Sequence, residues 1–176
     1  VFLAENVKGL KTDDNGKTLA SIISFIEQSG YTLIENHIYK TMMYKVPQKR
    51  ERLILIGVRN DLVDKFNFER PSYYHRILTV RDALCKGELY DTDVPLSIGQ
   101  RYPKRKEEIM DFVPEGGYWR DLPLDLQKEY MKGSFNLAGG KTGMARRLSF
   151  DEPSLTLTCS PAQKQTERCH PVENRP

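Results

Sequence analysis

The sequence predicts an α/β protein, with part of a doubly wound sheet in residues 1–59 and a smaller mixed α+β domain in residues 60–176. Three observations support this. Leu53–Val58 is apolar except for one glycine, which is typical of a strand buried on both faces. Residues 18–29 carry apolar side chains at helical spacing between two strand-like segments. From Asn60 onward aromatic and charged residues are mixed without such a pattern, so we place the domain boundary there.

The first domain is expected to run as strand, helix, strand and returning strand. Leu19, Ile22 and Ile26 give the helix one apolar face, and Gly30 is a stop signal. The expected elements, in order, are a strand at 2–7, a turn at 13–16, a helix at 18–29, a strand at 31–39, a turn at 44–48 and a strand at 52–58. This pattern is half of a doubly wound sheet.

The second domain is expected to contain short elements joined by loops. A helix at 79–84 begins through Thr79 and Asp82, and a helix at 103–112 turns Ile109 and Met110 inward. We interpret Trp119 as a core residue in preference to a base-stacking one. The other expected elements are a loop at 87–101, a turn at 114–117 and a strand at 155–158.

Composition is that of an ordinary soluble globular protein, with 39% hydrophobic and 29% charged residues and a net charge of +3. No apolar run is long enough for a transmembrane helix and no basic signal-peptide region begins the chain, so we expect a cytoplasmic protein. Cys85, Cys159 and Cys169 are too few and too scattered for a disulfide framework. They also lack the four closely spaced ligands that zinc requires, even with His170 counted, so no metal is expected.

Two strand ends carry polar groups suited to a ligand. Gln48, Arg50 and Arg52 stand at alternate positions before the core strand, so their side chains leave an extended chain on one side. Glu5 and Asn6 lie at the end of the first strand, where ligands bind in α/β sheets. The open alternative is that Glu51 and nearby acids neutralise the two arginines on a solvated strand end.

These two blocks together resemble the DNA cytosine C5 methyltransferases. Ala4–Val7 matches the family's Glu-Asn-Val motif, and Val46–Leu53 matches its Gln-x-Arg-x-Arg motif in the same order. Gly116–Pro123 resembles the Gly-Gly-x-Trp-Arg-Asp-Leu-Pro segment of the target recognition domain in many bacterial members. The resemblance implies that residues 1–59 end a Rossmann-like catalytic domain and that residues 60–176 form the target recognition domain. Lys45 departs from the glycine that is common there.

The resemblance also implies roles for the strand-end residues. Glu5 engages N3 and the exocyclic amine of a flipped cytosine, provided that the pocket is dry enough to favour the protonated acid. Arg52 donates to cytosine O2 and holds Glu5, and Arg50 contacts the backbone of the flipped nucleotide or the nucleophile loop. Asn6 supports the strand end, and Gln48 orients the loop.

The family's remaining chemistry precedes these blocks. Its glycine-rich loop for S-adenosylmethionine and its Pro-Cys nucleophile are not in these residues, so no nucleophile and no cofactor-binding residue is assigned. We therefore expect a fragment that is inactive alone, or one subunit of a split bacterial enzyme. The rival interpretation is a non-catalytic DNA-binding module, and a structured RNA is a third, less favoured, substrate.

Double-stranded DNA is the expected partner, and two loops of the second domain are expected to contact it and recognise its sequence. Lys132–Phe150 contains four basic residues and no carboxylate. The loop 139–149 joins glycines to basic residues, without the spacing of a nucleotide-binding P-loop, and the loop 159–168 is rich in amides that suit the major groove. Solvated connecting loops are the alternative. The candidate DNA contacts are Lys141, Arg146, Arg147, Thr156, Gln163, Lys164, Gln165 and Arg168.

Overall fold

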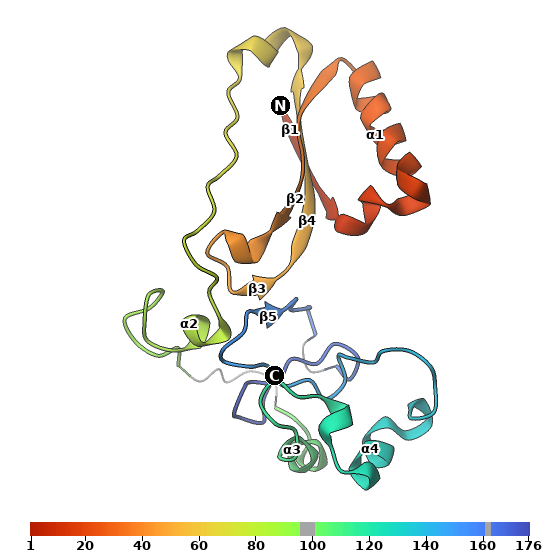
Figure 1. Ribbon diagram of the computed structural model, residues 1–176, viewed down its shortest axis with the longest axis vertical. Coiled ribbons are helices and arrows are strands. Elements are labelled where there is room, and N and C mark those ends of the chain that lie inside the picture. Colours follow the sequence, from red (N-terminus) through yellow and green to blue (C-terminus); the bar gives the residue numbers. More distant parts are fainter. Residues whose placement is uncertain (96–100, 161–162) are drawn as a thin grey trace. The chain divides into compact units, whose positions relative to one another are not determined.

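The computed structural model describes residues 1–95, 101–160 and 163–176, and the chain divides into two compact units (Figure 1). Unit 1 is Val1–Arg76 and unit 2 is Ile77–Pro176, each with its own hydrophobic core. The boundary falls later than the 59/60 boundary expected from the sequence. Residues 96–100 and 161–162, which belong to two of the expected loops, lie outside the described residues.

Unit 1 is built on a three-stranded sheet in the order β1-β4-β2. Its elements are β1 (Phe2–Val7), η1 (Lys8–Lys11), η2 (Asp13–Gly16), α1 (Lys17–Gln28), β2 (Tyr31–Lys40), η3 (Thr41–Met43), β3 (Gln48–Lys49), β4 (Glu51–Arg59) and η4 (Asn60–Lys65). β4 is antiparallel to both neighbours, so β1 and β2 run in the same direction and are joined by α1. The expected strands and helix are confirmed within a mixed α/β unit. β4 is the returning strand that the sequence predicts, and it is antiparallel to β2 because the short connection between them returns the chain beside β2.

The core of unit 1 lies between the sheet and α1, which covers one face of it (Figure 1). Leu53 and Leu55 of β4 pack with Leu19 of α1 on that face. Ile56 and Val58, whose side chains point to the opposite face, are also buried, so the prediction of a strand buried on both faces is confirmed. α1 begins after Gly16, whose φ of +85° closes the predicted 13–16 turn at little steric cost.

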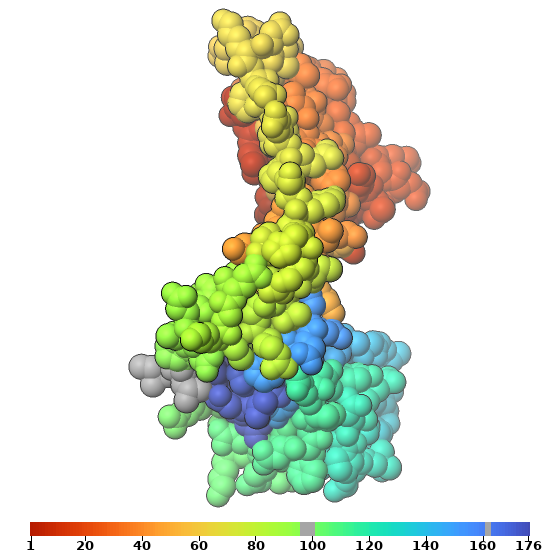
Figure 2. Space-filling view, turned by 60° about the vertical axis from the view of Figure 1, so that its left-hand side comes forward, coloured from red at the N-terminus to blue at the C-terminus, as the bar shows by residue number. Residues whose placement is uncertain are grey.

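Residues 60–76 belong to unit 1 because they form hydrogen bonds with residues of that unit. After η4 the chain is extended and largely exposed, and it runs along the surface of this unit as the yellow to yellow-green segment of Figure 2. The Tyr74 amide donates to the Met43 carbonyl at 2.8 Å. Arg70 makes two hydrogen bonds to Glu35 of β2, at 3.0 and 2.9 Å. These contacts explain why the unit boundary lies beyond residue 59.

Unit 2 consists of short elements around a core that contains Trp119, which is 5% exposed. Thr79 and Asp82 form a capping box at the start of α2, and Ile109 and Met110 are buried, as predicted. The expected strand at 155–158 is shorter than predicted, because pairing reaches only Leu155. The elements are α2 (Val80–Leu84), α3 (Lys104–Met110), η5 (Trp119–Asp121), α4 (Leu124–Met131), η6 (Lys132–Ser134) and β5 (Ser154–Leu155).

α4 was not predicted from the sequence, although its signals are present. Pro123 stands immediately before the helix, a position that proline tolerates well. Leu126, Tyr130 and Met131 then turn toward the core of unit 2 at helical spacing. Among the described residues, no helix is both long and apolar enough to span a bilayer.

Candidate functional site

The register of the sheet in unit 1 gathers the strand-end residues on one face. Glu5 lies opposite Ile54 and Val7 lies opposite Arg52, and opposite residues of an antiparallel pair share a face. Because side chains alternate along a strand, Glu5 and Arg52 both lie on the face that Leu53 and Leu55 leave free. This face is the one turned away from α1.

The predicted meeting of the carboxylate and the guanidiniums is present in the structure. Arg52 Nε lies 2.5 Å from Glu5 Oε1, and Arg50 Nη2 lies 4.0 Å from the same oxygen. The Glu5 side chain is 48% exposed and the Arg52 side chain 24%. Within unit 1 the carboxylate is therefore held from one side and open on the other, so unit 1 does not itself supply a dry pocket.

The alternative was that Glu51 and nearby acids neutralise the arginines, and Glu51 pairs with two lysines instead. The Glu51 carboxylate lies 2.5 Å from Lys8 Nζ and 3.8 Å from Lys40 Nζ. The hydrogen bond from Lys8 holds the pKa of Glu51 below its ordinary value. Arg52 meets Glu51 only through the backbone, where its Nη1 donates to the carbonyl at 2.8 Å. The arginines therefore share Glu5 and not Glu51.

Asn6 and Gln48 are tied to the backbone near this cluster. The side-chain oxygen of Asn6 accepts from the Val7 amide at 2.8 Å, which fixes the end of β1 locally. Asn6 lies opposite Leu53 and so on the other face from Glu5. The Gln48 carbonyl accepts from Thr41 Oγ1 at 2.6 Å, which holds the turn before Arg50 in place.

Lys45 occupies the backbone conformation that glycine favours. Its φ is +62°, in the left-handed region that costs a side chain with a Cβ about 1–2 kcal/mol. Because the family commonly has glycine here, the sequence left the backbone conformation of this turn open. The turn keeps a glycine-like conformation, and Lys45 Nζ lies 5.2 Å from the centroid of the Tyr74 ring.

A buried carboxylate, Glu35, lies on β2 and was missed by sequence reasoning. Its side chain is 2% exposed, and it accepts hydrogen bonds from Arg70 and from the Tyr39 hydroxyl at 2.9 Å. Arg70 lowers the pKa of Glu35. Burial, together with Glu35, raises the pKa of Tyr39 to about 12. No local pattern links residues so far apart in the chain, so the sequence offered no signal for this cluster.

In unit 2 the structure corrects the expectation for Arg147. This side chain is almost fully buried, and the expected DNA contact is instead a support of the fold. Loop segments without secondary structure leave carbonyls that need donors, and the guanidinium provides them. Its acceptors are the carbonyls of Met110, Val113, His170 and Glu173 and the side-chain oxygen of Asn174.

Four other candidate cations are half-buried and also donate to backbone carbonyls. Arg146 donates to Thr142 at 3.0 Å and to Gly116 at 2.8 Å. Burial, followed by repulsion from Arg146, lowers the pKa of Arg168. The remaining carbonyl contacts join Lys141 to Ser134 and Leu137, Lys164 to Tyr130, and Arg168 to Glu167.

The amide-rich loop is more open. Gln163 and Gln165 are exposed, and Thr156 is half-buried. Gly143 lies so close to this loop that a Cβ there would overlap the Gln165 carbonyl oxygen. The absence of a side chain at this glycine therefore lets another segment of the protein's own backbone approach closely. Among the residues that the structure describes, no cluster of three metal-ligating side chains occurs.

Similar proteins were found for the whole chain. Residues 1–168 match the family described as C-5 cytosine-specific DNA methylase. The type II methyltransferases M.PspPI of a Psychrobacter strain and M.Eco47II of Escherichia coli are each 68% identical over 176 residues, which is 100% of this chain and 42% of the relative. M.Sau96I of Staphylococcus aureus is 48% identical over 179 residues, covering 99% of this chain and 39% of the relative.

A solved structure agrees at the level of the fold. It is a crystal structure of an E. coli prophage protein assigned as a DNA modification methyltransferase, with a TM-score of 0.50 and 18% identity. The match covers 99% of this chain and 55% of that one. The chain thus spans about 40% of the length of the curated relatives it matches. On the family match over residues 1–168, this chain belongs to the C-5 cytosine-specific DNA methylases.

Proposed function

We propose that this chain contributes the base-gripping part of a DNA cytosine C5 methyltransferase. The observation that supports it best is the cluster in which Arg52 Nε lies 2.5 Å from Glu5, with Arg50 at 4.0 Å from the same oxygen. A pyrimidine edge with an amine, a ring nitrogen and a carbonyl matches a carboxyl group beside a guanidinium. Unit 1 would supply these groups, and unit 2 would be the target recognition domain.

The proposed chemistry requires a proton at cytosine N3. Carbon C6 accepts a nucleophile when negative charge on the ring is neutralised as it forms, and a carboxylic acid at Glu5 can do this. Arg52 would donate to O2 and keep the Glu5 carboxyl in place. The Glu5 carboxylate is half-exposed, so water must be excluded from it before it can act as an acid. The flipped base itself would exclude that water. Asn6 and Gln48 would act only by fixing the backbone.

S-adenosylmethionine supplies the methyl group in this reaction. The segment between β1 and α1, which follows Glu5, contains two short helical turns with Lys8, Lys11, two aspartates and two separated glycines, and so is not a glycine-rich cradle. We therefore assign no residue of this chain to that cofactor. Double-stranded DNA would be the substrate, and Gln163 and Gln165 the most accessible of the expected reading groups. We further propose that residues 1–176 need a complementary catalytic segment to be active.

The decisive experiment replaces Glu5 by Gln in the full-length protein. Turnover should fall by about 10²–10⁴-fold, the usual contribution of a positioned acid, while duplex DNA affinity is retained. Glu51→Gln is the matched control, because that carboxylate pairs with Lys8 and Lys40 instead. Methyl transfer by Glu5→Gln at the wild-type rate would contradict the proposal.

A further inference from the structure

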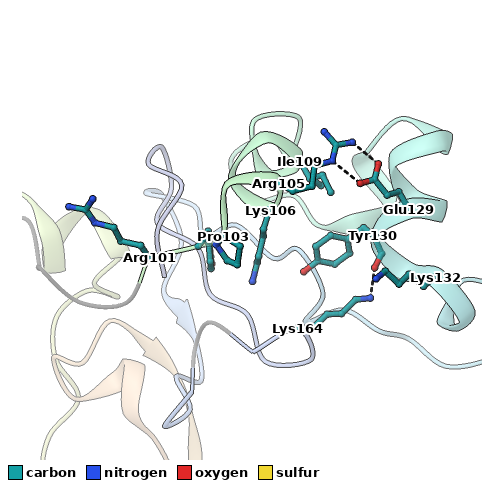
Figure 3. A pocket seen from close by; sticks show the side chains of 10 residues that line it. Arg101, Pro103, Arg105, Lys106, Ile109, Glu129, Tyr130, Lys132 and Lys164 are labelled. Carbon is teal, nitrogen blue, oxygen red and sulfur yellow. Dashed lines mark hydrogen bonds and ion pairs between the residues drawn. The ribbon is translucent and has the colours of Figure 1, made fainter.

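Unit 2 contains a pocket that the proposed chemistry does not use. Its volume is about 600 Å³, which is within the usual range for small-ligand sites. The lining comes from three segments of the chain, at residues 101–109, 129–132 and 164. Figure 3 shows Lys106 and Lys164 beside the Tyr130 ring, with Arg105 turned to Glu129.

The lining is strongly cationic. Arg101, Arg105, Lys106, Lys132 and Lys164 contribute five positive groups, against the single carboxylate of Glu129. Such an excess of one charge in a concave site concentrates ions of the opposite sign. The pocket therefore favours an anion.

Two of these cations already have partners. Arg105 binds Glu129 in a two-pronged contact at 2.7 and 2.6 Å. Lys106 Nζ lies 2.5 Å from Glu167, a fully buried carboxylate that also accepts from the Tyr130 hydroxyl at 2.6 Å. This second pair fixes the position of one ammonium group at the pocket wall.

The other two lysines make no direct ion pair among the residues that the structure describes, although Glu129 interacts electrostatically with Lys132 and Glu167 with Lys164. Lys164 Nζ donates to the Tyr130 carbonyl and Lys132 is exposed, and neither forms an ion pair there. The pKa of Lys164 is lowered first by burial and next by the charge of Lys132. Glu167 opposes this shift, and Lys106 adds a smaller lowering. Lys164 is thus near enough to be repelled by both other ammonium groups, and an anion beside it would relieve that repulsion.

The geometry points to a phosphate ester as the ligand. We propose that Lys106, Lys132 and Lys164 bind its phosphate group, because ammonium groups act as point charges and suit a tetrahedral anion with several oxygens. Tyr102, Pro103 and Ile109 form apolar walls that leave space for the ester portion. The phosphate comes either from a nucleic acid strand or from a free phosphate monoester. This site is independent of Glu5 and its chemistry.

The test compares two double variants with equal loss of charge. Lys132→Gln with Lys164→Gln removes two pocket cations, and Lys104→Gln with Lys128→Gln removes two exposed cations on α3 and α4 outside the pocket. Inorganic phosphate is titrated at constant ionic strength against chloride, and amide NMR signals of Lys106 and Ile109 are followed. The pocket variant should bind phosphate at least about tenfold more weakly than the control, as expected for lost charged hydrogen bonds.

A second titration identifies the source of the phosphate. If a short DNA duplex moves the same signals, and the slope of log affinity against log salt falls by about one per lysine removed, the ligand is a strand phosphate. If inorganic phosphate moves these signals and the duplex does not, the ligand is a free phosphate ester. Equal phosphate affinity in both double variants, or no shift at the pocket, would overturn the proposal. The Glu5→Gln variant, whose pocket is intact, should bind inorganic phosphate as the wild type does, which separates this site from the Glu5 chemistry.

Discussion

The strand-end cluster of unit 1 and the loops of unit 2 use arginine in opposite ways. In unit 1, Arg50 lies just before β4 and Arg52 lies on it, and both approach the half-exposed carboxylate of Glu5. In unit 2, Arg147 is buried and its donors end on backbone oxygens. A strand satisfies its own backbone groups through the ladder, so its side chains are free for a ligand. A loop has no such ladder of backbone hydrogen bonds, so its carbonyls accept from side chains. Those side chains are then no longer available to bind a ligand.

The sharpest test of this contrast is Arg147→Ala against Arg146→Ala. Truncating Arg147 leaves several buried carbonyls without a donor, so the free energy of unfolding of unit 2 should fall by about 4 kcal/mol. Arg146 is half-exposed, and its loss should reduce the free energy of unfolding by about 1 kcal/mol.

Denaturant unfolding followed by fluorescence measures both variants, because Trp119 is the single tryptophan and lies in the core of unit 2. Equal losses from the two substitutions would remove the distinction between a supporting arginine and an accessible one. A normally stable Arg147→Ala that has lost DNA affinity would restore the original expectation for Arg147.

The contact between the two loops gives the second test. Gly143→Ala should reduce the free energy of unfolding of unit 2 by about 1–3 kcal/mol, because its Cβ would overlap the Gln165 carbonyl. Gly133→Ala is the control, since nothing lies within 4 Å of the position of its Cβ. The same tryptophan signal reports on both. If the two alanines prove equally harmless, the loops do not pack as tightly as the structure has them.

Sequence reasoning succeeded where a period fixes the direction of side chains. The alternation of Gln48, Arg50 and Arg52 predicts that both arginines point to one side, and in the structure both approach the same oxygen of Glu5. The same periods locate α1 and β4 almost to the residue. The placement of β4 between β1 and β2 was missed, because strand order depends on distant contacts that no local pattern encodes.

The sequence failed where side-chain direction depends on tertiary contacts. Arg146 and Arg147 are neighbours of one type in one loop, yet only the second reaches the carbonyls of Met110 and Val113. Lys106 and Glu167 are far apart in the sequence, so no periodic spacing of residues predicts that they pair. Burial of a charged side chain is the property that composition predicts least well.

A third test returns to unit 1 and its one buried carboxylate. Because Arg70 lowers the pKa of Glu35, the pair stabilises the fold above the unfolded pKa near 4.5, and this stabilisation is lost as pH falls through the lower folded pKa. Arg70→Met should reduce the free energy of opening of unit 1 by about 1–2 kcal/mol at neutral pH, less than for a fully buried pair because half of Arg70 faces water.

Hydrogen exchange of the β2 and β4 amides measures this effect without interference from unit 2. Wild-type protection should decline as pH falls below about 4.5, after correction for intrinsic exchange, and the Arg70→Met variant should show a smaller decline. Arg59→Met is the control, since its partner Asp61 is exposed. An unchanged pH dependence in Arg70→Met would mean that the buried carboxylate does not need its guanidinium.

The smallest effect is expected at Lys45, in the turn that leads to the arginines. Glycine relieves the strain of φ +62°. It also loses the contact with Tyr74 and has more backbone entropy in the unfolded chain. Because the relief of strain is the larger effect, Lys45→Gly should stabilise unit 1 by about 0.5 kcal/mol. Lys45→Ala keeps the strain and loses the contact, so it should destabilise. Lys49→Gly, at negative φ in β3, should also destabilise, by about 0.5–1 kcal/mol. Exchange of the Thr41 amide, which donates to the Arg50 carbonyl across this turn, reads out all three signs. If the backbone of this turn sets the position of Arg50 and Arg52, only Lys45→Gly should stabilise, and the other two variants should destabilise. Any other combination of signs would mean that the Lys45 side chain sets that position.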